Sequence, residues 1–114
     1  MSMHRGTLDL MIETAVACLA AEDHRDIAKL VRTLAQRWPQ EPALSIAFAL
    51  TSAAAAVEDV VDSPDTTAAA HKGYRLAALV AADIFALESI GQVPATGQDL
   101  LHFWRRVDPY FLNL

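Results

Sequence analysis

The chain contains one cysteine and four glycines among its 114 residues. A single cysteine cannot form an internal disulfide, and it cannot by itself build a zinc site. Four glycines leave no glycine-rich loop of the kind that holds phosphate groups. We therefore expect Cys18 to be a small buried side chain on a helix, and we expect no cofactor and no bound metal ion.

Positive charge and long apolar runs are also scarce. The chain has 9 basic and 14 acidic residues, a formal net charge of −5, whereas nucleic-acid binding needs a local excess of basic residues. The longest uncharged stretch, from Pro42 to Val57, is shorter than the ~20 residues of a membrane-spanning helix. Asp9 and Glu13 interrupt any signal-peptide core. We expect a cytoplasmic protein with no nucleic-acid partner and no membrane partner.

The chain is rich in apolar residues, which make up 54% of it and include 22 alanines. Alanine favours helices. The apolar residues recur at steps of three and four, which places them on one face of a helix, and no segment alternates as a strand does. Composition and pattern predict an all-α protein in which residues 1–114 form a single helical domain.

Capping residues and prolines divide the chain into five helical segments. Their expected starts are Thr7, Asp23, the residue after Pro42, Ser63 or Asp65, and Thr96. Gly91 is expected to follow the end of the fourth segment. Short connections are typical of antiparallel neighbours. We predict an up-down antiparallel bundle of four long helices plus a short C-terminal helix.

The apolar stripe of each segment predicts its buried side. On the segment that starts after Pro42, Val60 is expected to be the last residue of the buried stripe. The predicted stripe of the fourth segment consists of Ala70, Gly73, Ala77, Val80, Ile84 and Leu87.

Aromatic residues gather near the C-terminus. Leu100, Trp104 and Val107 share one face of the last helix and are expected to dock it on the bundle. The residues that remain as candidates for partner binding are Phe103, Tyr110 and Phe111, because exposed aromatic side chains often anchor interfaces. The alternative is that this segment folds back over its own core.

A basic stripe runs along the second segment, where Arg25, Lys29 and Arg32 recur at steps of four and three. We take it as a second candidate partner-binding surface. The alternative is an ordinary solvated helix face, because exposed ion pairs contribute little.

His71 lies early on the longest expected helix, followed directly by Lys72 and Gly73. This run resembles the phosphoacceptor region of histidine phosphotransfer domains. The resemblance implies an exposed phosphoacceptor His71, a cation that offsets the phosphoryl charge, and a glycine that leaves room for a partner. Here the lysine and glycine are closer to the histidine than in that family, and Arg75, one turn on, could supply the charge.

No catalytic constellation is recognised in the sequence. The serines lack the glycine context of a nucleophile elbow, and the pair Asp99 and His102 falls short of the ligand set of a di-iron bundle. We therefore predict a small soluble interaction module, homodimeric and without catalytic activity, with a possible further protein partner. The alternatives are a sensor or regulatory bundle that binds a small ligand between helices, and a phosphotransfer-like bundle that uses His71.

Overall fold

The computed structural model describes residues 6–60 and 63–114, which form five α-helices and one short 3-10 helix. Those two ranges contain no β-strand, only one isolated bridge between Pro42 and Thr96. The all-α class predicted from the sequence is confirmed. The helices are α1 (Thr7–Ala20), α2 (His24–Arg37), α3 (Ala43–Val60), α4 (Pro64–Ser89), α5 (Gly97–Arg106) and the 3-10 helix η1 (Tyr110–Leu112).

Capping side chains fix most of these boundaries. Asp23 Oδ1 accepts hydrogen bonds from two backbone N–H groups in the first turn of α2, and Ser63 Oγ accepts one in the first turn of α4. Thr96 and Asp99 form a reciprocal capping box at the start of α5. After α4, Gly91 has a φ of +99°, which glycine reaches without steric cost. The sequence predicted Asp23, Thr96 and Gly91 at these positions, and it gave Ser63 as one of two candidates. Thr7, expected to cap α1, is instead the first residue of that helix, whose N-cap Gly6 makes no side-chain hydrogen bond.

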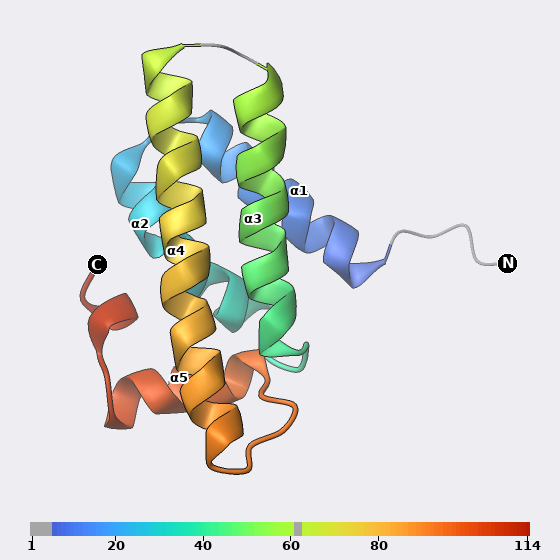
Figure 1. The fold of residues 1–114 in the computed structure, drawn as a ribbon, viewed down its shortest axis with the longest axis vertical. Helices are drawn as coiled ribbons and strands as arrows, with labels where there is room; N and C mark the ends of the chain where they lie inside the picture. The colour runs from blue at the N-terminus through green and yellow to red at the C-terminus, as the bar shows by residue number, and fades with distance from the viewer. Residues whose placement is uncertain (1–5, 61–62) are drawn as a thin grey trace, which may run out of the picture.

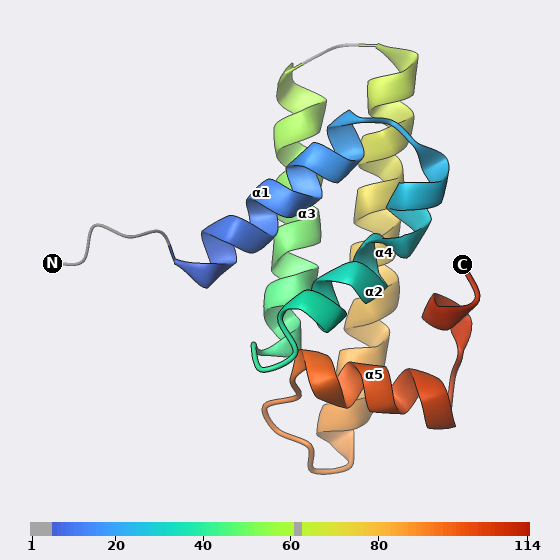
Figure 2. The same ribbon diagram turned by 180° about the vertical axis from the view of Figure 1, so that it is seen from behind.

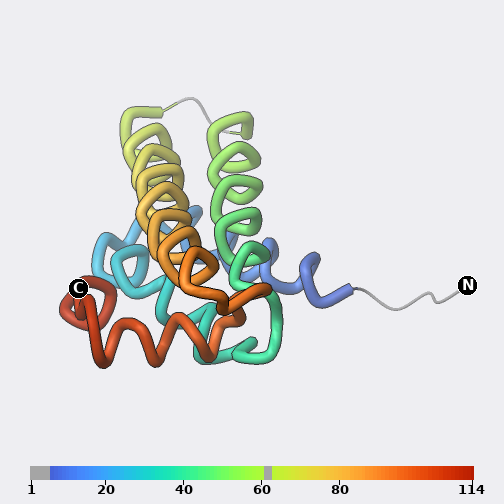
Figure 3. Tube along the Cα trace, turned by 60° about the horizontal axis from the view of Figure 1, so that its bottom comes forward, coloured from blue at the N-terminus to red at the C-terminus, as the bar shows by residue number. Residues whose placement is uncertain are grey.

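The helices form two layers. α3 and α4 lie side by side and antiparallel in Figure 1, and α1 and α2 cross one side of this pair obliquely, as the reverse view in Figure 2 shows. α5 crosses near the lower ends of α2, α3 and α4, and the C-terminal segment turns back beside α2 (Figure 3). The antiparallel pairing of α3 with α4 matches the prediction, but the oblique crossings do not confirm a parallel-sided up-down bundle.

The core lies between the two layers. All six residues of the stripe predicted on α4, from Ala70 to Leu87, are buried. At Gly73 the helices approach closely, because an added Cβ would lie 3.0 Å from Leu19 Cδ1 and 3.1 Å from Ala54 Cβ. Small residues at this crossing therefore let α1, α3 and α4 meet.

Val60 and Val107, which the sequence predicts to face the core, are instead exposed. Val60 at the end of α3 is 78% exposed and Val107 after α5 is 68% exposed. Both lie at helix ends, where the neighbouring helices no longer cover the stripe. Val107 was expected to help dock α5 on the bundle, and Phe111 is buried there instead. Its ring centroid lies 5.0 Å from that of Trp104.

α3 is apolar on more than one side. Among the helices of residues 6–60 and 63–114 it alone is long and apolar enough to cross a membrane by length and composition, with a mean hydropathy of 1.5 over 18 residues. Core helices pass the same test, and 44% of these residues are buried within the fold. The apolar residues of α3 that lie outside the core therefore need a separate explanation.

Candidate functional site

The C-terminal aromatic residues do not form the exposed surface that the sequence predicts. Phe111 is only 2% exposed and belongs to the core. Phe103 is half-buried against the same core, while Tyr110 remains 42% exposed. The alternative arrangement, in which the segment folds back over the core, is the one observed. The Phe111 ring packs against that of Trp104 in a tilted contact that holds the segment there.

The basic stripe of α2 is divided between two roles. Arg32 is half-buried, and its Nη1 donates a hydrogen bond of 3.3 Å to the carbonyl oxygen of Leu112. It therefore fixes the C-terminal segment. Arg25 and Lys29 are exposed, so two of the three predicted residues remain available to a partner.

His71 lies exposed on α4, as the resemblance to phosphotransfer domains implies. Within the described ranges it has no hydrogen bond and no ion pair. The neighbouring Gly73, however, is buried against Leu19 and Ala54. The glycine therefore makes room for helix packing and does not open the surface beside His71.

An apolar face on α3 was missed by the sequence analysis. Leu44 and Phe48 are one turn apart on this helix, with Thr51 following on the same side. Leu44 is 65% exposed and Phe48 is 54% exposed. Figures 1 and 2 show that α1 and α2 cover one side of the α3–α4 pair and leave the other side open. The exposure of Leu44 and Phe48 indicates that they face the open side.

The matching side of α4 is also apolar. Phe85 is 75% exposed, and the three preceding residues on its helix face are exposed alanines, Ala78, Ala81 and Ala82. A shallow hollow of 490 Å³ lies between the two helices, lined by residues of α3 and α4 that include Phe48 and Ala81. We call the set Leu44, Phe48, Thr51, Ala78, Ala81, Ala82 and Phe85 the outer face.

The outer face ends in a polar contact. Tyr74 Oη donates a hydrogen bond of 3.3 Å to Oε1 of Glu58, from α4 to α3. From this pair toward Leu44 and Phe85, the seven residues of the outer face include no charged side chain. The arrangement is suited to burial against another apolar surface.

Comparison of the chain with models of known families, with curated proteins and with solved structures finds no match.

Proposed function

We propose that the protein is a helical interaction module that forms a homodimer through the outer face. The observation that carries this proposal is the exposure of three large apolar side chains, Leu44, Phe48 and Phe85, on one uncovered side of α3 and α4. Large contiguous apolar patches on folded domains mark interaction sites. The partner contacts then come from α3 and α4, while the C-terminal segment packs against the core.

A second copy suits this face because the face carries both protruding and recessed parts. Phe48 and Phe85 project, while Ala78 and Ala81 line the hollow between the helices. A two-fold axis brings the same patch of both copies together, so each protrusion of one copy meets the hollow of the other. Two antiparallel helix pairs packed in this way form a four-helix interface of a common kind.

A dimer of standard size needs more of α3 and α4 than the outer face alone. The outer face covers residues 44–51 of α3 and 78–85 of α4, about 12 Å of each helix at ~1.5 Å per residue, and two adjacent helices are about 20 Å wide. An interface of ~800 Å² per partner therefore extends beyond these seven residues along both helices. The scarcity of charge on the face means that few ions lose water on association.

Mass in solution tests the proposal. The wild-type chain is expected at about twice its monomer mass of 12.4 kDa in light scattering at micromolar concentration. Phe48→Glu should be monomeric with an unchanged helical circular dichroism spectrum, because the introduced charge would have to be buried between the copies.

Val107→Glu is the matched control, since Val107 is 68% exposed directly after α5 and lies outside the outer face. It should remain dimeric. A monomeric wild-type protein, or a Phe48→Glu variant that stays dimeric, contradicts the proposal.

A further inference from the structure

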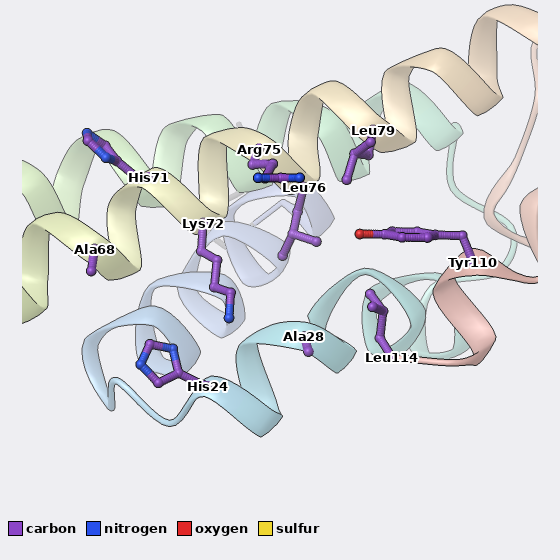
Figure 4. A pocket seen from close by; sticks show the side chains of 10 residues that line it. All are labelled: His24, Ala28, Ala68, His71, Lys72, Arg75, Leu76, Leu79, Tyr110 and Leu114. Carbon is purple, nitrogen blue, oxygen red and sulfur yellow. The ribbon is translucent and has the colours of Figure 1, made fainter.

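A cavity of 510 Å³ lies between α2, α4 and the C-terminal segment (Figure 4). Lys72, Arg75 and Leu76 of α4 form one wall, His24 of α2 stands opposite, and Tyr110 of η1 closes one end. The volume is within the range of about 300 to 1,000 Å³ that is typical of small-molecule sites. The cavity is on the other side of α4 from the hollow of the outer face, so its occupant differs from the dimer partner.

Apart from the Tyr110 hydroxyl group, the polar side chains that line this cavity are basic. Figure 4 shows the amino group of Lys72 directed toward His24 across the cavity, while Arg75 lies further along α4 toward Tyr110. None of the lining residues is acidic. In residues 6–60 and 63–114, neither His24, Lys72 nor Arg75 has a hydrogen bond or an ion pair. Unpaired positive charge in a chain of net charge −5 provides ready partners for an anionic ligand.

The rest of the lining is apolar. Leu76 and Leu79 extend into the cavity from α4, Ala28 lies on the α2 side, and Leu114 faces them from the C-terminal segment. The Tyr110 ring covers this part, and its hydroxyl group points inward toward Leu76. His71 contributes to the rim, but its ring is directed away from the cavity.

We propose that this cavity binds a small carboxylate with an apolar body, such as a medium-chain fatty acid. Arg75 and Lys72 would bind the carboxylate, since the guanidinium group matches carboxylate geometry with two parallel hydrogen bonds. The apolar body would lie against Leu76, Leu79 and the Tyr110 ring. A polyanion such as a nucleotide fits less well, because its additional charges would be placed against these apolar side chains.

Titration calorimetry with octanoate, 1-octanol and acetate tests the ligand class. Octanoate should bind saturably. 1-Octanol lacks the charge and acetate lacks the apolar body, so each should bind at least ~10-fold more weakly, the loss expected when one good polar or apolar contribution is removed. No saturation by octanoate at millimolar concentration overturns the proposal, and so does equal binding of 1-octanol or of acetate.

Variants then test the location. Arg75→Gln and Lys72→Gln should each weaken octanoate binding at least ~10-fold. Lys29→Gln, which removes an exposed charge on α2 outside the cavity lining, should change it less than ~2-fold. Unchanged affinity in both cavity variants means that octanoate binds elsewhere and overturns the assignment. The series is repeated in the Phe48→Glu background, so that a failed dimer and a failed ligand site give separate results.

Discussion

The indole Nε1 of Trp104 donates a hydrogen bond of 2.9 Å to Oδ2 of Asp83. This contact joins the buried side of α5 to α4, and Trp104 is fully buried. Asp83 is half-buried, and partial loss of water raises the pKa of its carboxyl above the ordinary value. The nearby Asp108 raises this pKa further, while the hydrogen bond from Trp104 opposes the shift.

The raised pKa of Asp83 predicts a pH dependence of stability. The folded state holds this proton more tightly than the unfolded state, so the contribution to stability is largest at low pH and is lost as pH rises through the interval from the ordinary to the raised pKa. Asp83→Asn keeps an acceptor for Trp104 but has no proton to lose. The unfolding free energy of wild type minus that of Asp83→Asn should therefore fall as the pH rises from below the ordinary aspartate pKa of about 3.9 to neutral pH.

Urea unfolding of both proteins across this range measures the difference. Asp83→Leu is the companion variant, because it leaves Trp104 Nε1 buried without an acceptor and should cost about 1 to 3 kcal/mol at neutral pH. A difference between wild type and Asp83→Asn that rises with pH would show that the sign of the pKa shift is wrong.

Phe111→Ala should destabilise the fold by about 3 to 5 kcal/mol, because it leaves a cavity beside Trp104. Tyr110→Ala, at a 42% exposed neighbour, should cost much less. Chemical unfolding measures both, and the milder Phe111→Leu allows the mass in solution to be measured on a folded protein. That variant should remain dimeric. If Phe111→Leu dissociated into monomers without losing stability, Phe111 would belong to the dimer interface and not to the core.

Gly97→Ala should be destabilising because α5 begins against the backbone of the α2–α3 connection. An added Cβ would lie 2.8 Å from the carbonyl oxygen of Trp38 and 3.2 Å from that of Ala35, and overpacking of this kind costs about 1 to 3 kcal/mol. Gly6→Ala, where nothing lies within 4 Å, is the control. Equal thermal stability of the two variants would contradict the close approach.

Cys18 should react slowly with alkylating reagents. Burial raises the pKa of its thiol, and the carboxylates of Asp26 and Asp23 add to the shift, so little reactive thiolate forms at neutral pH. Iodoacetamide should modify the native protein more slowly than free glutathione, and at the ordinary rate after unfolding in urea. Native alkylation faster than that of glutathione would identify a functional thiol instead.

Local signals in the sequence were sufficient to predict where most of the helices begin. Asp23, Ser63 and Thr96 cap the helices that they were expected to cap, because a cap depends on bonds within a few residues. The burial of Phe111 and the exposure of Val107 could not be predicted in this way, because both depend on how the chain turns after α5. They are set by tertiary packing and not by local sequence.

The outer face shows a second feature that the sequence pattern does not predict. A stripe such as Leu44, Phe48 and Thr51 has helical spacing, but spacing does not reveal which side of a helix its neighbours cover. Here α1 and α2 pack on the same side of α3 and α4, and the other side remains apolar. The basic cavity was likewise hidden, because it combines Lys72 and Arg75 of α4 with residues of α2 and η1 that are distant in sequence.

An isotope-filtered nuclear Overhauser measurement on a mixture of labelled and unlabelled copies tests the dimer most directly. A dimer formed through the outer face should give contacts between the Phe48 ring of one copy and the Ala78 or Ala81 methyl group of the other, because a two-fold axis places the protrusion in the hollow. Intermolecular contacts from Phe103 or Tyr110, with none from the outer face, would contradict it.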